Sequence, residues 1–191
     1  MTKVIAFFVL LTSVFNSVFS QTWTEEYFKA GVPDAKKFLD TVKYAARQSI
    51  GTPAPQLKFV NIESGSADSL RSYLGSVLLV SLWQTGCVPC VKELPDLEQI
   101  RKAYADQGLV LLCISPENKE RQFKFFSEKT ISVSGLKAMM PFASYLKPFQ
   151  YMANPAGFIV DRTGIIRDAW IGPQTFDSLK EKIKPYLVPR Q

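Results

Sequence analysis

Two cysteines separated by two residues, Cys87 and Cys90, directly follow an apolar run at residues 77–82. Such a run is typical of a strand buried on both faces, and helical spacing of apolar residues begins at Val88. Cys87 is therefore expected at a helix N-terminus, where backbone N–H groups and the helix dipole stabilise a thiolate. Cys90 is expected one turn away, close enough to close a disulfide. The pair predicts a reversible dithiol–disulfide switch, with Cys87 as nucleophile and Cys90 as resolving thiol.

The cysteine and histidine counts exclude several other sites. The chain of 191 residues has three cysteines and no histidine. It is therefore not a disulfide-dense scaffold, and a structural zinc site or a His-ligated haem would lack ligands. We expect no metal and no cofactor. A static disulfide at Cys87 and Cys90 is the alternative, which the tight spacing at a strand–helix junction disfavours. The third cysteine, Cys113, lies in a second apolar run and is expected in the core.

Two further side chains near the cysteines are candidates for roles in the same site. Glu93 is three residues past Cys90 and so about one helical turn along. A carboxylate there could accept the proton of Cys90 during resolution, or raise the thiol pKa values by like-charge repulsion. The alternative for Glu93 is a solvated surface position. Trp83, at the end of the strand, is expected to cover the flank of the disulfide, to pack in the core, or both.

The N-terminal residues have the pattern of an export signal. Lys3 is followed by an almost unbroken apolar stretch, and residues 18–20 allow cleavage between Ser20 and Gln21. Residues 1–20 are therefore predicted to be a signal peptide, and retention as an uncleaved membrane anchor is the alternative. The net charge of +6 is dispersed among acids, so nucleic-acid binding is not expected.

Periodicity and turn residues divide the remaining chain into an extension over residues 21–50 and a domain over residues 51–191. The extension is predicted to be helical over residues 34–49, and a Gly/Pro-rich break follows it. In the domain we expect strands at 57–62, 77–83, 109–114, 157–160 and 165–171, helices at 88–107, 118–129 and 175–186, and a helix or turn at 67–74. Residues 130–151 are expected to be a loop with a short helix. The strands at 77–83 and 109–114 should be parallel, and the last two should form an antiparallel hairpin.

This element order resembles thioredoxin, and four sequence features resemble its exported relatives, the TlpA/ResA-like thiol-disulfide oxidoreductases. Together the features cover roughly residues 51–187. They are Trp83-x-x-x-Cys87-x-Pro89-Cys90, Lys92-Glu93-x-Pro95, Asn154-Pro155 before Phe158-Ile159-Val160-Asp161-x-x-Gly164, and Gly51-x-Pro53-Ala54-Pro55. The resemblance implies an α/β, thioredoxin-like fold, in which a central mixed sheet is flanked by helices and preceded by the helical extension.

The resemblance also implies roles for individual residues. Glu93 corresponds to an active-site acid, and Pro155 is expected to be cis and packed against the cysteine pair. Backbone beside such a proline pairs with a bound peptide as an added strand, so Asn154 and Pro155, together with Trp83, are the expected substrate-binding residues. The chain departs from the family at Gly86, where a Trp is frequent, and around Asn154, where a Thr-rich run is usual.

We therefore expect an exported thiol-disulfide oxidoreductase, located in the periplasm or cell envelope, that reduces disulfides of envelope proteins. Its expected partners are disulfide-containing exported proteins and a membrane thiol electron donor, and relatives of this kind act in cytochrome c maturation. The alternatives are a peroxiredoxin-type peroxide reductase, a non-catalytic thioredoxin-like binding module, and a disulfide isomerase or oxidase. The sequence around Cys87 lacks the Pro-x-x-x-Thr-x-x-Cys run of a peroxiredoxin.

Overall fold

The computed structural model describes residues 35–141, 144–145 and 154–187. The predicted signal peptide lies outside these residues, and so do residues 142–143 and 146–151 of the predicted loop with a short helix at residues 130–151. The chain divides into two units, residues 1–41 and residues 42–191, and the second contains the sheet. Helix α2 (Ala35–Gln48) agrees with the helix predicted at residues 34–49. Within the described residues, no helix has both the length and the apolar character of a membrane span.

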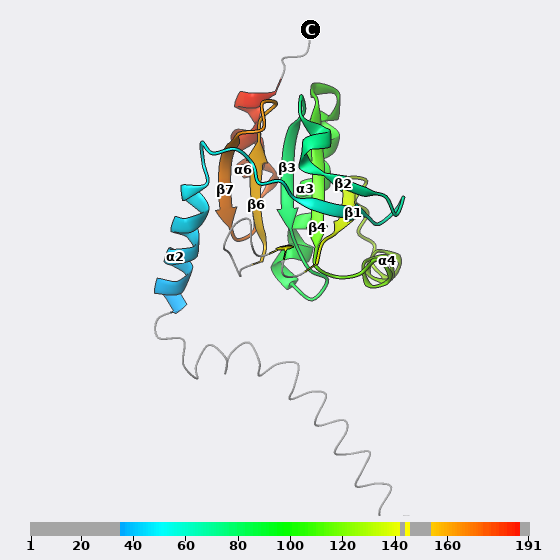
Figure 1. Cartoon of the computed structure of the whole chain (residues 1–191). Helices are drawn as coiled ribbons and strands as arrows, with labels where there is room; N and C mark the ends of the chain where they lie inside the picture. Colours follow the sequence, from blue (N-terminus) through cyan, green and yellow to red (C-terminus); the bar gives the residue numbers. More distant parts are fainter. Residues whose placement is uncertain (1–34, 142–143, 146–153, 188–191) are drawn as a thin grey trace, which may run out of the picture. The chain divides into compact units, whose positions relative to one another are not determined.

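A seven-stranded mixed sheet forms the centre of the second unit (Figure 1). The strand order is β2-β1-β5-β4-β3-β6-β7, in which β3 pairs in parallel with β4 and β4 with β5, while the other pairs are antiparallel. The strands are β1 (Lys58–Asn61), β2 (Ala67–Ser69), β3 (Val77–Leu82), β4 (Leu109–Ser115), β5 (Leu136–Met139), β6 (Ala156–Val160) and β7 (Ile166–Ile171).

Two apolar clusters cover the two faces of this sheet. Alternate residues of β3 explain the division, because successive side chains of a strand point to opposite faces. Val77, Leu79 and Trp83 pack with α3 (Val88–Tyr104) and α6 (Phe176–Ile183), whereas Leu78, Val80 and Leu82 belong to the second cluster. Every residue of β3 is buried, as predicted for a central strand. Helix α3 therefore starts from a strand end that is fixed on both sides.

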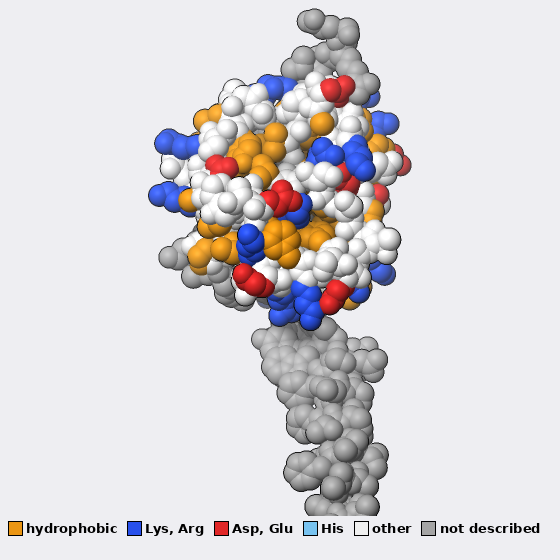
Figure 2. All heavy atoms as spheres, turned by 90° about the vertical axis from the view of Figure 1, so that its right-hand side faces the viewer, with side chains coloured by type: hydrophobic (Ala, Val, Ile, Leu, Met, Phe, Trp, Pro, Cys, Tyr) orange, Lys and Arg blue, Asp and Glu red, His pale blue; other side chains and the backbone are white. Residues whose placement is uncertain are grey.

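The remaining elements lie at the surface. They are α4 (Lys119–Glu128) and the short 3-10 helices η1 (Leu70–Tyr73), η2 (Ala105–Gln107) and η3 (Lys184–Tyr186). Figure 2 shows basic and acidic side chains interspersed with apolar ones on the face that it presents. On that face, the charge is dispersed as the sequence indicates.

The structure corrects the prediction at two short strands. Residues 136–139 form β5, which pairs with both β1 and β4, where a loop with a short helix was expected. Residues 67–69 form the edge strand β2, and only residues 70–73 of the expected helix or turn are helical. Both strands are only three or four residues long, which is too short for a clear periodic pattern in the sequence. They form strands because they hydrogen-bond to neighbouring strands. The predicted parallel β3–β4 pair and the β6–β7 hairpin are confirmed.

A glycine in β6 allows the hairpin to pack tightly beside the predicted cis-proline. Gly157 pairs with Trp170 of β7 and with Ser81 of β3. A Cβ added to Gly157 would lie 2.5 Å from Cζ2 of Trp170 and 2.9 Å from the carbonyl oxygen of Val80. The indole ring and the backbone of β3 thus occupy the space that any side chain at this position would need.

Gly157→Ala is therefore expected to lower the free energy of unfolding by about 1–3 kcal/mol, the usual cost of overpacking a core. Urea unfolding monitored by circular dichroism measures it. Gly86→Ala is the control, because nothing lies within 4 Å of its added Cβ, and it should change stability by less than about 0.5 kcal/mol. Equal stability of the two variants would contradict the packing account.

Candidate active site

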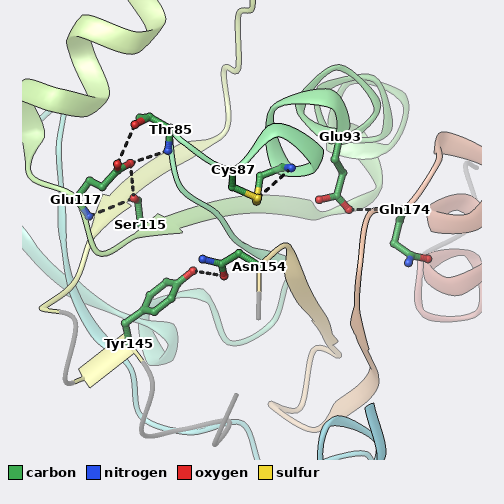
Figure 3. Close-up of a disulfide and its surroundings, with 9 residues drawn as sticks. Thr85, Cys87, Glu93, Ser115, Glu117, Tyr145, Asn154 and Gln174 are labelled. Carbon is green, nitrogen blue, oxygen red and sulfur yellow. Dashed lines mark hydrogen bonds between the residues drawn. A yellow bond between two sulfur atoms is a disulfide. The ribbon is translucent and has the colours of Figure 1, made fainter. Parts of the chain in front are cut away.

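Cys87 and Cys90 form a disulfide at the N-terminus of α3, with their Cα atoms 5.2 Å apart. Cys87 is the N-cap residue, and its Sγ accepts a hydrogen bond from the backbone N–H of Cys90 at 3.3 Å (Figure 3). Cys87 is half-buried, whereas Cys90 is 1% exposed. When the disulfide is reduced, the helix N-terminus will favour a thiolate at Cys87. The Cys87 sulfur is thus the more accessible of the two, and the Cys90 sulfur is buried.

Glu93 is a buried acid, so the solvated alternative is wrong. Its side chain is only 3% exposed, and its Oε1 accepts a hydrogen bond from the backbone N–H of Gln174 at 2.9 Å. Burial raises the pKa of Glu93 to about 7, against the lowering effect of the Gln174 bond, and the negative charge of Asp96 raises it further. A carboxyl group with this pKa can both accept and release a proton near neutral pH.

Trp83 belongs to the core and not to the exposed site. Its side chain is 0% exposed, and its ring centroid lies 5.4 Å from that of Phe125 and 5.3 Å from that of Phe126. Trp83 and Cys90 belong to the same apolar cluster, and Cys87 packs against this cluster. A side chain without exposed surface cannot contact a substrate. The prediction that Trp83 binds substrate is therefore wrong, and the residue packs in the core.

The Asn154–Pro155 peptide bond is cis, which confirms that part of the prediction. The structure fixes this segment from both sides. Oδ1 of Asn154 accepts a hydrogen bond from the hydroxyl group of buried Tyr145 at 2.8 Å. The carbonyl oxygen of Pro155 accepts one from the backbone N–H of Gly172 at 2.8 Å. Asn154 and Pro155 therefore have a defined conformation next to β6.

Glu117 is a site residue that the sequence analysis missed. Its carboxylate accepts hydrogen bonds from the backbone N–H and the hydroxyl group of Thr85 at 2.7 and 2.8 Å. It also pairs with Arg121 at 2.8 Å and accepts a hydrogen bond from Ser115. Glu117 thus anchors the loop that leads into Cys87, and in the view of Figure 3 it lies on the other side of Cys87 from Glu93. Nothing in its spacing to the cysteines signals this contact, which spans 32 residues.

A row of paired residues crosses the sheet on the face covered by α3. Ser81 of β3 pairs with Cys113 of β4 and with Gly157 of β6. Cys113 is fully buried, as expected, and burial raises the pKa of its thiol to about 12. The hydroxyl group of Ser81 is buried and has no hydrogen-bond partner among the described residues. Glu93 is the buried carboxylate of the first two turns of α3.

The described residues include no group of three His, Cys, Asp or Glu side chains arranged to hold a metal ion. The chemistry that this arrangement supports is thiol–disulfide exchange. A half-buried sulfur at a helix N-terminus, a buried second sulfur and a buried acid lie along the first two turns of one helix. Such a site forms and breaks one disulfide and moves one proton.

Two buried acids on α3 have opposite pKa directions, and they predict opposite effects of pH on stability. Because the pKa of Glu93 is raised to about 7, the folded state binds its proton more tightly than the unfolded state. Stability from this group is present below about pH 4.5 and is lost as the pH rises to about 7. As the pH rises from 4.5 to 8, the free energy of unfolding of Glu93→Gln should therefore increase relative to that of the wild type by up to about 3 kcal/mol. Chemical denaturation of the oxidised proteins across this range measures it.

Glu98→Gln is the matched control on the same helix. Burial raises the pKa of Glu98, but hydrogen bonds from Arg101 and from the backbone of Ser134 outweigh it, and the net direction is down. Its stabilising effect is therefore present above the ordinary carboxyl pKa and is lost as the pH falls. Glu98→Gln should lose stability relative to the wild type at neutral pH and recover it in acid. The same pH trend in both variants would contradict the assignment for Glu93.

The comparisons with known proteins agree with this geometry. Residues 50–169 match the model of the AhpC/TSA family. The thioredoxin-like protein YneN of Bacillus subtilis is 28% identical over 142 residues, which cover 70% of this chain and 78% of that protein. The thiol-disulfide oxidoreductase ResA of Bacillus thuringiensis is 24% identical over 138 residues, or 72% of this chain and 79% of ResA.

Solved structures show the same fold. The thioredoxin domain of a thiol-disulfide oxidoreductase from Bacteroides vulgatus superposes with a TM-score of 0.64 at 22% identity, covering 73% of this chain and 98% of that domain. A thiol:disulfide interchange protein from Chlorobium tepidum gives a TM-score of 0.61 at 24% identity, covering 71% and 96%. With the family match and the Cys87–Cys90 disulfide, these relatives show that the chain belongs to the AhpC/TSA family and is a TlpA/ResA-like thiol-disulfide oxidoreductase of the thioredoxin superfamily.

Proposed function

We propose that this protein is an exported reductase that reduces disulfides in proteins of the cell envelope. The observation that carries the proposal is the asymmetric pair, in which Cys87 is half-buried at a helix N-terminus and Cys90 is 1% exposed. An exchange enzyme needs one sulfur that a partner can reach and one that only the first sulfur can reach. The signal-like residues 1–20 support export, and with it a place in the periplasm or cell envelope.

The reaction starts from the reduced protein. The Cys87 thiolate attacks one sulfur of the partner disulfide, which forms a mixed disulfide and releases the other partner sulfur as a thiolate. Cys90 then loses its proton and its sulfur attacks Cys87, which closes the Cys87–Cys90 disulfide and releases the second partner sulfur. The partner gains two electrons and the enzyme loses two. The Cys87–Cys90 disulfide of the structure is the product state of this cycle.

Glu93 is the group that we assign to the proton of Cys90. It lies one turn along α3, is 3% exposed, and has a pKa of about 7. In its ionised form it can take the proton as Cys90 attacks, and in its protonated form it can return a proton when the disulfide is reduced again. No other acidic side chain of α3 is both buried and raised in pKa.

The surface around Cys87 offers two places for a polypeptide substrate. Val88 is 64% exposed directly after the nucleophile, and the fixed Asn154–Pro155 backbone can pair with an extended chain. On the other side a groove of about 590 Å³ lies between the Thr85–Gly86 loop and α4, and Arg121 and Lys124 are among its lining residues. A disulfide in an extended segment of a partner fits this arrangement.

The proposed partners follow from the direction of electron flow. After each cycle the Cys87–Cys90 disulfide must be reduced by a donor with access to the same compartment. For an exported protein, a membrane thiol donor fills this role. The apocytochrome c thiol pair, once oxidised, is one substrate of the right chemistry, which would place the protein in cytochrome c maturation.

A peroxide substrate is the second candidate, because the matching family model is described as AhpC/TSA. In that reaction the Cys87 thiolate would attack a peroxide oxygen and become a sulfenic acid, and Cys90 would then close the disulfide with loss of water. The residues before Cys87, Trp83-Gln84-Thr85-Gly86, lack the expected peroxiredoxin pattern. Disulfide reduction is therefore the function that the site supports best.

Single-cysteine variants test the proposal. Cys90→Ser leaves Cys87 able to attack but removes the resolving thiol, so it should accumulate a mixed disulfide with a disulfide-containing protein substrate. Cys87→Ser should form none, because Cys90 is buried. Non-reducing gel electrophoresis and mass spectrometry of the adduct measure both. Cys113→Ala is the control, and it should turn over substrate at the wild-type rate because its thiol lies in the core.

Three outcomes would contradict the proposal. Adduct formation by Cys87→Ser as efficient as by Cys90→Ser would reverse the assigned roles. Wild-type turnover by both variants would support a non-catalytic binding module. Consumption of hydrogen peroxide by the reduced protein much faster than reduction of a protein disulfide would favour the peroxide reaction.

A further inference from the structure

Three residues, Gly172, Pro173 and Gln174, join the end of β7 to the N-cap of α6. The backbone N–H of Gly172 donates a hydrogen bond to the carbonyl oxygen of Pro155 at 2.8 Å. The backbone N–H of Gln174 donates one to Oε1 of Glu93 at 2.9 Å (Figure 3). Pro173 between them has no N–H. Each N–H group of the segment is thus bonded to the site, one to the cis-proline and one to the buried acid.

The segment is held in one conformation. Gly172 has a φ angle of +101°, which a residue with a side chain rarely adopts, and the ring of Pro173 fixes the next φ angle. The side chain of Gln174 accepts a hydrogen bond from the hydroxyl group of Ser178 at 2.7 Å, and its amide donates to the carbonyl oxygen of Pro173 at 3.1 Å. A shift at one end of so short and restricted a segment therefore moves the other end.

We propose that Gly172–Gln174 is a positioning segment that links the substrate-docking backbone at Pro155 to the carboxylate of Glu93. The inference rests on the proposed function, in which a substrate lies against Pro155 and Glu93 takes the proton of Cys90. Through the segment, the position of the docked chain controls the hydrogen bond on which the ionised acid depends. Docking and resolution are then coupled steps of one reaction.

The groups around Glu93 determine whether its carboxyl group is protonated, and the connecting segment supplies one of them. On its own helix, the charge of Asp96 opposes the ionised form of Glu93. In the proposed function, Cys90 supplies the proton. On the sheet, burial raises the pKa of the Cys113 thiol to about 12, so this thiol stays neutral and adds no charge beside Glu93. The connecting segment contributes the N–H of Gln174, which favours the ionised form. Withdrawal of this donor leaves the acid protonated at neutral pH, and a protonated acid cannot accept the proton of Cys90.

Two substitutions, one at each end of the segment, test the link. Gln174→Pro removes the N–H that bonds to Glu93. Gly172→Ala disturbs the end that bonds to Pro155 and leaves the N–H of Gln174 in place. Each should raise the titration midpoint of the Glu93 carboxyl group, by about one pH unit for Gln174→Pro, the equivalent of one hydrogen bond to a charged group. Carbon-13 NMR of the Glu93 carboxyl in the full-length oxidised protein measures it, because Cys87 and Cys90 do not titrate in that state.

Gly75→Ala is the matched control for backbone strain. Gly75 has a φ angle of +94°, and nothing lies within 4 Å of an added Cβ at either glycine. The two alanine variants should therefore lose similar stability, but only Gly172→Ala should shift the Glu93 midpoint. A wild-type midpoint in Gly172→Ala, or an equal shift in Gly75→Ala, would overturn the link. Should Gln174→Pro fail to fold, Gly172→Ala decides.

The rate of reduction of a disulfide-containing protein by the same variants separates the link from the proposed function. If the midpoint shifts and the rate of disulfide reduction falls at neutral pH, both stand. If the midpoint shifts while the wild type reduces no disulfide, the structural link stands and the proposed function fails. If the wild type is active but its Gly172→Ala variant keeps the wild-type midpoint and rate, the link fails alone.

Discussion

The active site depends on a buried carboxyl group, that of Glu93, which lies one helical turn past Cys90 and has no cationic partner among the described residues. Burial of Glu93 raises its pKa to about 7, and the Gln174 N–H is the contact that favours the charged form. This arrangement costs stability at neutral pH, since a desolvated carboxylate is favoured less than a hydrated one. A structural role alone would be met by an apolar residue. The cost is consistent with a group that exchanges protons with Cys90.

The sheet explains how this constraint is maintained. Strand β3 is buried on both faces, so the start of α3 is fixed relative to β4 and β6. Trp83 packs on α4 beneath the cysteines, and Glu117 anchors the loop before them. A hydrogen bond from Gly172 joins the β7–α6 connection to the cis-proline segment. These contacts hold the segments of the site in place and limit the reorganisation that the exchange needs.

The sequence predicts the site where chemistry and spacing coincide in one short stretch. Cys87, Cys90 and Glu93 lie within seven residues of one helix, so helical geometry alone brings them together. The contacts of Glu117 and Gln174 could not be predicted, because they join segments 32 and 81 residues apart, and the second uses a backbone N–H that no residue type marks. The burial of Glu93 was missed for the same reason. Residues 136–139 form a strand only because β1 and β4 flank them.

The central claim is that the Cys87–Cys90 pair donates electrons to its partners. The reduction potential of this pair, measured by equilibration in defined thiol redox buffers, tests the claim most directly. The account predicts a potential near or below about −250 mV, in the range of thioredoxin-type reductants. A potential near about −120 mV, as in a strong oxidant, would contradict it and reverse the direction of electron flow.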